Sequence, residues 1–436
     1  MTRWRNWSGI VTADPSEVER PRDADEVVAC VQRARAAGST VKMVGSGHSF
    51  SAIAAPRDTL LRPEGLSGIV AVDRAAGTVT ALAGTRLREL NTGLERLGLS
   101  LHNMGDIDAQ TLAGAISTGT HGTGGVTAGL PAQVAGLELV TGTGELLRAT
   151  AEEHPDVLDL ARVGLGALGV LTAITFRVEP LFLLEAHETR LSWAEALDGF
   201  DERAAATHHL DSYWFPHTDH VLTKTNDRLA ADLDEAEPLS PLRAWLDDEL
   251  LSNRVFGASH AVTNRFPATV APFNRVAGRL LSERSYSDVA HRVFTSPRGV
   301  VFREMEYALP RAAGLDALRE CRRALEASDL RITFPVELRV APAEDVPLSP
   351  AYGRDTFFLA FHTHRDVDHR AYFALMEPIL RAHGGRPHWG KVHTLGAADL
   401  APLYPRFADF LALRERLDPR DAFRNAWLDR HLLGGR

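Results

Sequence analysis

A short apolar run, Val41 to Val44, leads directly into Gly45-Ser46-Gly47-His48-Ser49-Phe50-Ser51. Small residues in a tight turn after a strand free several backbone N–H groups to converge on an anion such as a phosphate. Phe50 stands where a dinucleotide fingerprint has its third glycine, and no Gly-Lys-Ser/Thr follows, so neither a Rossmann nor a Walker A loop is predicted. Taken alone, the stretch is better explained as a strand-to-loop turn with an incidental histidine.

A second glycine-rich stretch runs from Thr111 to Gly125, with five glycines and five hydroxyl residues in fifteen positions. Such residues build little core and suit close approach of backbone and hydroxyl groups to a polar ligand. A flexible surface loop is the alternative, but apolar segments flank the stretch on both sides. Two such cradles together suit a long ligand with several phosphates and a ring system.

Several motifs in order resemble one family. Asn6-Trp7-Ser8-Gly9, the stretch from Val44 to Phe50 and Ser117-Thr-Gly-Thr-His-Gly-Thr-Gly124 are similar to the vanillyl-alcohol-oxidase-type flavoproteins, especially the sugar-1,4-lactone oxidases and alditol oxidases. The resemblance covers nearly the whole chain and continues in these motifs: Leu168-Gly169-Val170, Met305-Glu306-Tyr307, Pro335-Val336-Glu337-Leu338-Arg339, Gly385-Arg-Pro-His-Trp-Gly-Lys391, Asp418-Pro419 and Phe423-Arg424-Asn425.

The resemblance implies an α+β protein of two lobes. Residues 1–180 would form an FAD-binding domain of the PCMH type, rejoined by about 391–436, and residues 181–390 a cap with an antiparallel sheet that binds the substrate.

The resemblance also implies a cofactor, FAD bonded covalently through His48 as an 8α-histidyl linkage. A neutral imidazole nitrogen is a competent nucleophile for such a bond. Only Cys30 and Cys321 are present, so the second glycine-rich stretch offers no cysteine for a second tether. The residues expected around the cofactor are Val44, Gly45, Ser46, Gly47, His48, Ser49, Phe50, Ser51, Thr111, Gly114, Ser117, Gly119, Thr120, His121, Thr123, Gly124, Gly169 and Val170.

Four residues are expected at the reacting carbon, namely Glu337, Arg339, His362 and Lys391. Glu337 and Arg339 share one face of an alternating strand, which without the resemblance would suggest only a solvated salt bridge. Strand periodicity places Trp389, Lys391 and His393 on one face, and in relatives the matching lysine lies in the active site. His362 matches a histidine of the lactone-acting relatives and favours a lactone.

The implied reaction is oxidation of an L-gulono- or D-arabinono-1,4-lactone, with hydride passing to the flavin and O2 reoxidising it to give H2O2. An alditol oxidase acting on xylitol or sorbitol, a lactone dehydrogenase with another electron acceptor, and a flavin-binding module without turnover are the alternatives. The sequence does not identify the residue that takes the hydroxyl proton.

Composition excludes other classes of function. The chain has 436 residues, 44% hydrophobic and 24% charged, and a formal net charge of −9. That negative charge does not favour binding to nucleic acid or to an anionic membrane. No apolar run reaches the length of a membrane span. His383, His388 and His393 lack the spacing of a zinc site, so no metal is expected. A cytoplasmic enzyme is predicted; its oligomeric state is not.

Local patterns predict the main elements. A helix begins at Asp23 and ends at Gly38, and strands are expected at 79–83, 137–140, 145–149 and 170–178. Other predictions are a helix over 156–168, a domain boundary at Glu179-Pro180, a surface helix over 230–250, an edge strand over 331–340 and a strand over 357–364.

Overall fold

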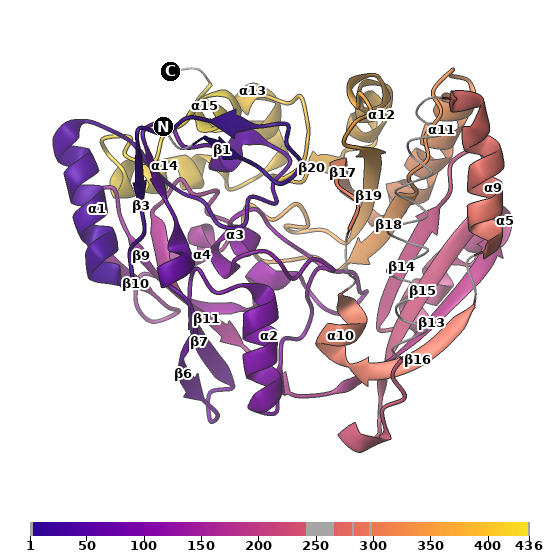
Figure 1. The fold of residues 1–436 in the computed structure, drawn as a ribbon, viewed down its shortest axis with the longest axis horizontal. Helices are drawn as coiled ribbons and strands as arrows, with labels where there is room; N and C mark the ends of the chain where they lie inside the picture. The colour runs from indigo at the N-terminus through magenta and orange to yellow at the C-terminus, as the bar shows by residue number, and fades with distance from the viewer. Residues whose placement is uncertain (1–2, 241–265, 281–282, 296–298, 435–436) are drawn as a thin grey trace.

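The computed structural model describes residues 3–240, 266–280, 283–295 and 299–434. Two lobes lie side by side (Figure 1). One contains the chain up to about residue 180 together with the C-terminal segment, and the other is built on a single large sheet.

The N-terminal lobe holds two sheets. A parallel sheet has the order β3-β5-β4, and an antiparallel sheet the order β10-β9-β11-β7-β6. Their strands are β3 (Glu17–Glu19), β4 (Val41–Met43), β5 (Thr59–Leu61), β6 (Ile69–Asp73), β7 (Thr78–Leu82), β9 (Val134–Val140), β10 (Leu146–Ala149) and β11 (Val170–Arg177). The helices are α1 (Ala24–Ala37), α2 (Leu87–Arg96), α3 (Leu112–Ser117) and α4 (Pro155–Ala161).

The second lobe is an antiparallel sheet of eight strands in the order β16-β13-β15-β14-β18-β19-β17-β20. The helices α11 (Gly314–Glu326) and α12 (Arg370–Ala382) pack against each other beside it. Its strands are β13 (Leu183–Ser192), β14 (His209–Trp214), β15 (His220–Leu229), β16 (Arg284–Val289), β17 (Phe302–Pro310), β18 (Val336–Ala341), β19 (Thr356–His364) and β20 (Arg386–Pro387).

Smaller elements complete the described part of the chain. The short strands are β1 (Trp4–Arg5), β2 (Thr12–Ala13), β8 (Leu99–Ser100) and β12 (Glu179–Pro180), and the remaining helices of these lobes are α5 (Trp193–Asp198), α6 (Phe200–Ala206), α9 (Val270–Leu280) and α10 (Ala290–Phe294).

The C-terminal segment returns to the N-terminal lobe, where α13 (Ala397–Leu400), α14 (Phe407–Leu417) and α15 (Ala426–Leu428) appear in yellow beside the indigo strands (Figure 1). Val41 N donates to Ala422 O at 2.7 Å. The buried Asn425 amide donates to the carbonyls of Ile53 and Ala55, both at 3.0 Å. The two ends of the chain therefore form one folded unit.

Several local predictions are confirmed. Asp23 caps α1 by accepting from Glu26 N, and Gly38 ends the helix in the left-handed region at φ 65°. Strands β9 and β10 correspond to the strands expected at 137–140 and 145–149 and pair antiparallel with each other, and β19 covers the predicted strand over 357–364.

Other predictions are wrong. The strand expected over 331–340 begins only at Val336, and as β18 it lies between β14 and β19, so Pro335 precedes an interior strand instead of lying on an edge. The helix over 156–168 ends at Ala161, and the chain then turns through Leu165 and Gly166 at positive φ.

Two further predictions concern loops. Trp389 and Gly390 form a turn after β20, and residues 391–393 have no regular structure, so Trp389, Lys391 and His393 do not share a strand face. Of the predicted surface helix over 230–250, the described residues 230–240 contain only a short 3-10 turn at Leu233–Glu235, and 241–250 lie outside the described residues.

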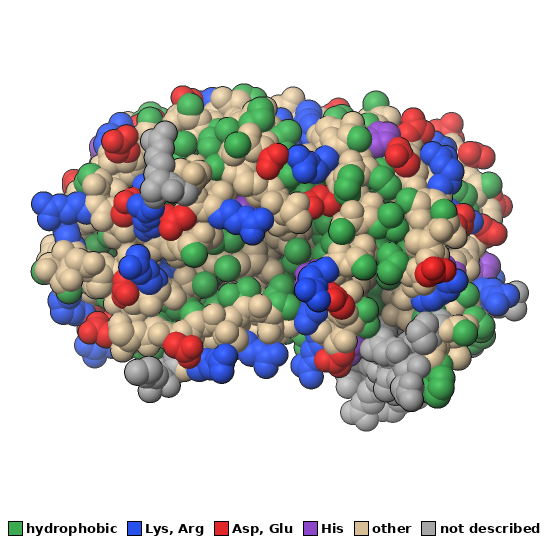
Figure 2. Space-filling view, turned by 90° about the horizontal axis from the view of Figure 1, so that it is seen from above, with side chains coloured by type: hydrophobic (Ala, Val, Ile, Leu, Met, Phe, Trp, Pro, Cys, Tyr) green, Lys and Arg blue, Asp and Glu red, His purple; other side chains and the backbone are tan. Residues whose placement is uncertain are grey.

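Acidic and basic side chains are interspersed over the face seen in Figure 2. Among the described residues, no helix has both the length and the apolar character needed to cross a bilayer.

Asn425→Ala should lower the free energy of unfolding by about 2 kcal/mol, because it leaves buried carbonyls and the Leu428 N–H without partners. Urea denaturation measures the change. The exposed residue Glu415 lies in the same segment, and Glu415→Ala is the control. Equal stability of both variants would show that Asn425 does not hold the two ends together.

Candidate functional site

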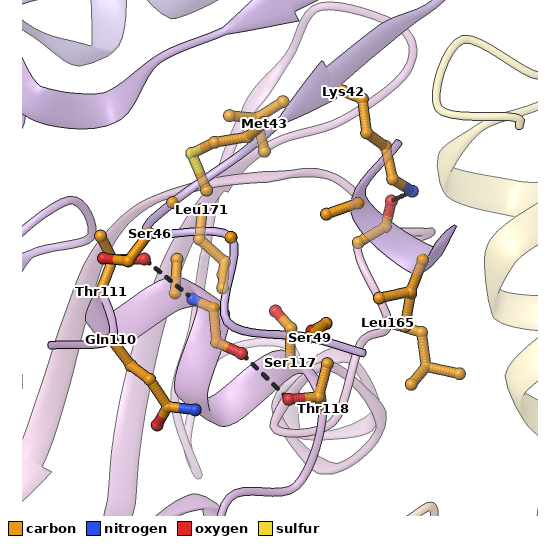
Figure 3. A pocket seen from close by; sticks show the side chains of 18 of the residues that line it. Lys42, Met43, Ser46, Ser49, Gln110, Thr111, Ser117, Thr118, Leu165 and Leu171 are labelled. Carbon is orange, nitrogen blue, oxygen red and sulfur yellow. Dashed lines mark hydrogen bonds between the residues drawn. The ribbon is translucent and has the colours of Figure 1, made fainter. Parts of the chain in front are cut away.

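A cavity opens in the N-terminal lobe between β4, the loop after it, α3 and the turn at 165–171 (Figure 3). Both glycine-rich stretches contribute to its walls. The predicted cofactor residues that line it are Gly45, Ser46, Gly47, His48, Ser49, Thr111, Gly114, Ser117, Gly169 and Val170.

The cavity walls come so close together that some positions on them have no room for a side chain. A Cβ at Gly45 would lie 2.0 Å from Thr111 Oγ1. Thr111 in turn caps α3 by accepting from Gly114 N at 3.3 Å. Gly47 adopts φ 70°, a conformation that other residues rarely take. The two loops therefore approach each other closely enough to hold a polar ligand with their backbones.

His48 presents an unpaired nitrogen at this cavity. Its Nδ1 is buried and has no hydrogen-bond partner in the described part of the chain, and its ring stacks on Trp7 with centroids 5.1 Å apart. Burial, together with the Lys391 charge, lowers the pKa of His48 to about 4. The imidazole is therefore neutral at physiological pH and carries a free lone pair or an unsatisfied N–H. Together with the glycine loops, this group fits FAD.

Some predicted cofactor residues do not line the cavity: Val44, Phe50, Ser51, Gly119, Thr120, His121, Thr123 and Gly124. Several of them connect segments instead. Phe50 N donates to Gly390 O at 2.6 Å and Gly124 N to Val340 O at 2.9 Å. The Thr123 hydroxyl donates to Leu210 O. Residues on these loops thus also join the N-terminal lobe to the second lobe.

Lys42 is a buried cation that also lines the cavity. Its Nζ donates to Gly166 O at 2.8 Å and Phe423 O at 3.4 Å, and neither acceptor is charged. Burial, assisted by the Arg414 charge, lowers the pKa of Lys42 to about 7.

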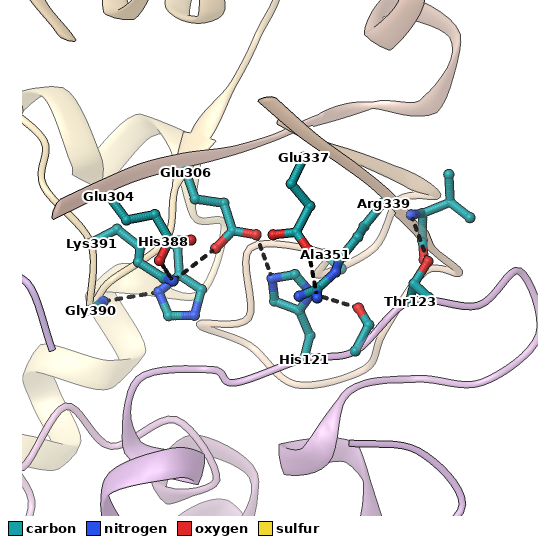
Figure 4. A network of polar contacts seen from close by, with 12 residues as sticks. His121, Thr123, Glu304, Glu306, Glu337, Arg339, Ala351, His388, Gly390 and Lys391 are labelled. Atoms are coloured by element: carbon teal, nitrogen blue, oxygen red, sulfur yellow. Dashed lines mark hydrogen bonds and ion pairs between the residues drawn. The ribbon is translucent and has the colours of Figure 1, made fainter. Parts of the chain in front are cut away.

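A second group of charged side chains lies on one face of the large sheet (Figure 4). Glu304 pairs in register with His362, and both Glu306 and Glu337 pair with Ala360. The adjacent strands β17, β19 and β18 therefore bring these side chains together, and Lys391 reaches them from the turn after β20. All four predicted catalytic residues meet here.

Ion pairs connect the group. Lys391 Nζ contacts Glu304 Oε2 and lies 3.8 Å from Glu306 Oε2. Arg339 places Nη2 2.7 Å from Glu337 Oε1 and Nε 2.8 Å from Asp211 Oδ1. The Glu337 contact is close but not aligned as a hydrogen bond.

The two carboxylates nearest His362 differ in basicity. Burial alone would raise the pKa of Glu304, but Lys391 and His362 hold it at about 2. Burial raises the pKa of Glu337 despite the opposing Arg339 charge, and Asp106 and Asp211 add to the effect. Glu337 is therefore the stronger base of the two.

His121 belongs to this group and not to the cavity. Its Nε2 lies 3.0 Å from Glu306 Oε1, its Nδ1 lies 2.8 Å from Gly122 O, and its ring stacks on Phe358. Despite burial, the Glu306 carboxylate raises the pKa of His121.

Sequence reasoning missed Glu304, Glu306, Asp106 and Asp211 as members of this group. The alternation Glu304-Met305-Glu306 signals that both glutamates share a face. The two aspartates depend on strand order and on a distant loop, and no local signal identifies them.

Two family comparisons cover most of the chain. Residues 15–150 match the FAD binding domain family, and residues 174–431 match the D-arabinono-1,4-lactone oxidase family.

Curated relatives match over nearly the full length. The chain is 38% identical to an L-gulono-1,4-lactone dehydrogenase of Mycobacterium tuberculosis over 98% of this chain and 99% of the relative. It is 34% identical to an alditol oxidase of a Streptomyces species over 99% of both, and 30% identical to the L-gulonolactone oxidase of Bos taurus over 98% of both.

Among solved structures, cholesterol oxidase from B. sterolicum shares the fold, with a TM-score of 0.83 and 18% identity over 99% of this chain and 96% of that one. This likeness confirms the expected two-lobed α+β fold.

Lys42 should make stability depend on pH. The pKa of Lys42 falls from 10.5 to about 7 on folding, so the unfolded chain binds the extra proton between these values. The free energy of unfolding should therefore rise from pH 7 towards pH 10, by up to about 1.4 kcal/mol per pH unit from this group. Lys42→Met should remove that rise and Lys224→Met should keep it, as measured by urea denaturation. An unchanged slope in Lys42→Met would contradict the assignment.

Proposed function

Since the chain belongs to the D-arabinono-1,4-lactone oxidase family and is an FAD-dependent oxidoreductase acting on CH–OH groups, we propose that its substrate is a sugar-1,4-lactone of the L-gulono or D-arabinono type. Residues 1–180 with about 391–436 would bind FAD, and residues 181–390 would form the substrate-binding cap.

The observation that supports this substrate is the position of His362. Its Nδ1 lies 3.2 Å from Pro335 O and its Nε2 3.6 Å from Glu304 Oε1, the carboxylate that Lys391 also contacts. A lactone offers carbonyl and ring oxygens that only accept hydrogen bonds, so a site rich in donors suits it.

The cofactor fits the cavity between the two glycine loops. FAD, when bound, supplies a two-electron acceptor for the hydride that leaves the substrate carbon. His48 Nδ1 would hold it covalently, which the buried, unpaired nitrogen and the low pKa of His48 support.

The charged side chains on and beside the large sheet would stabilise negative charge on the substrate and accept its hydroxyl proton. Arg339 and Lys391 remain cationic, since nearby carboxylates raise the pKa of both against the effect of burial. They would bind the substrate oxygens and stabilise negative charge as it develops. As hydride leaves the carbon, the hydroxyl proton would pass to Glu337 Oε1, and the product would be the corresponding carbonyl.

Anaerobic mixing with L-gulono-1,4-lactone, D-arabinono-1,4-lactone, xylitol and sorbitol tests the proposal, with flavin absorbance as the measurement. The lactones should bleach the flavin, and admission of O2 should then release H2O2. Bleaching by the polyols alone would indicate an alditol oxidase. Bleaching by a lactone without peroxide would indicate a dehydrogenase with another acceptor, and no bleaching by either class would contradict turnover.

His48→Ala should yield a flavin that acid precipitation releases into the supernatant, because the variant lacks the nucleophilic nitrogen. Wild-type protein and the neighbouring variant Ser49→Ala should keep their yellow colour in the pellet. Release of all flavin from acid-treated wild type would refute covalent attachment.

A further inference from the structure

We propose that Glu304 and Glu306 form a two-carboxylate clamp that keeps Lys391 protonated and fixed in position, so that Lys391 acts as a permanent positive charge and not as a proton carrier. The part of this inference that concerns the reaction rests on the proposed function. The two glutamates are positioning residues in this account.

The clamp holds both the side chain and the main chain of its lysine. Glu304 and Glu306 project from the same face of β17, and both carboxylates face Lys391 Nζ. The backbone carbonyls of the same glutamates accept from Val392 N at 2.9 Å and His388 N at 3.0 Å. The segment is therefore attached to β17 on either side of Lys391, which keeps the ammonium within reach of both carboxylates.

Each carboxylate is itself held from its other side. Glu304 Oε1 lies 3.6 Å from His362 Nε2, and Glu306 Oε1 lies 3.0 Å from His121 Nε2. Both glutamate side chains are 5% exposed, so neither can turn away into solvent. The two carboxylates are therefore fixed by their own strand β17 and by three side chains: His362 on β19, His121 on its loop, and Lys391.

Other groups around Lys391 do not replace the clamp. Its ammonium lies 5.0 Å from the centre of the Phe50 ring, and the imidazoles of His48 and His388 are kept neutral, since burial lowers the pKa of His48 to about 4 and that of His388 to about 3. Glu337 adds a third, weaker negative influence. The two glutamates of β17 therefore provide most of the charge that stabilises the ammonium.

Lys42 shows what happens to a buried lysine of this protein without such a clamp. Its ammonium donates to backbone carbonyls, and burial together with the Arg414 charge lowers the pKa of Lys42 to about 7 although the Asp418 carboxylate opposes the shift. Lys391 also loses solvent, with 18% of its side chain exposed, yet the two carboxylates raise its pKa. The contrast between these two lysines agrees with Glu304 and Glu306 as the main source of the raised pKa of Lys391.

The consequence for the reaction is a division of tasks. A lysine that stays charged can stabilise negative charge throughout the cycle, because its own state does not change as the substrate reacts. The hydroxyl proton must then go to a group outside the clamp, which agrees with the assignment to Glu337.

The chain has only three lysines, Lys42, Lys224 and Lys391, so the flavin-loaded protein labelled with [13Cε]lysine should give three resolvable signals. Single Lys→Arg variants assign the three signals. The 13Cε chemical shift of each signal, followed as the pH is raised, gives the protonation state of that lysine directly. In wild type Lys391 should remain protonated up to about pH 10. In Glu304→Gln/Glu306→Gln its midpoint should fall by at least about one pH unit, a tenfold change.

Glu377→Gln is the matched control, since Glu377 is a buried carboxylate that accepts from Tyr307 and Thr394 away from the clamp. This variant should leave the Lys391 signal unchanged. The single variants Glu304→Gln and Glu306→Gln provide smaller shifts in the same direction if the double variant does not fold. A Lys391 signal with the same midpoint in wild type and the clamp variants would overturn the clamp.

The rate of anaerobic flavin reduction, measured as a function of pH, tests whether the charge on Lys391 contributes to the reaction. The clamp variants should gain an alkaline loss of rate at the midpoint seen for Lys391, and wild type and Glu377→Gln should show none there. If the titration midpoint of Lys391 shifts but the alkaline loss of reduction rate does not appear, Lys391 does not stabilise charge in the reaction. If neither lactone nor polyol bleaches the flavin, the proposed function fails while the titration still decides the clamp.

Discussion

The backbone hydrogen bond from Phe50 N to Gly390 O, at 2.6 Å, joins the two halves of the site. It attaches the first glycine loop to the turn that carries Lys391, so the cavity of the N-terminal lobe and the charged face of the large sheet lie next to each other. The Ser51 hydroxyl adds a donor to Trp389 O at 3.3 Å. This junction holds the loop that carries His48 directly beside the turn that carries Lys391.

Many charged side chains are buried beside this junction. Isolated buried ions are costly, and they are tolerated where partners and hydrogen bonds compensate them. Here Glu304 and Glu306 face Lys391, and Glu337 faces Arg339, so each carboxylate lies near a cation. The pairing lets the sheet present charge to a substrate in a site that excludes much of the water, where such charge acts most strongly.

Sequence patterns predict what depends on neighbours along the chain. Asp23 and Gly38 mark α1 because capping is local, and the alternation in β18 places Glu337 and Arg339 on one face. Pro335 does not mark an edge strand, because the position of β18 in the sheet is set by its tertiary pairing with β14 and β19. Lys391 belongs to the site through a turn held by β17 and not through a strand of its own, and Asp106 and Asp211 reach Arg339 only in the folded protein.

A crystal structure of the protein purified with its yellow cofactor tests the central claim most directly. The account predicts continuous electron density from His48 Nδ1 into a flavin ring that lies between the two glycine loops and the face carrying Glu304, Glu337 and Lys391. A ring bound elsewhere, or one in this cavity but turned away from that face, would contradict it.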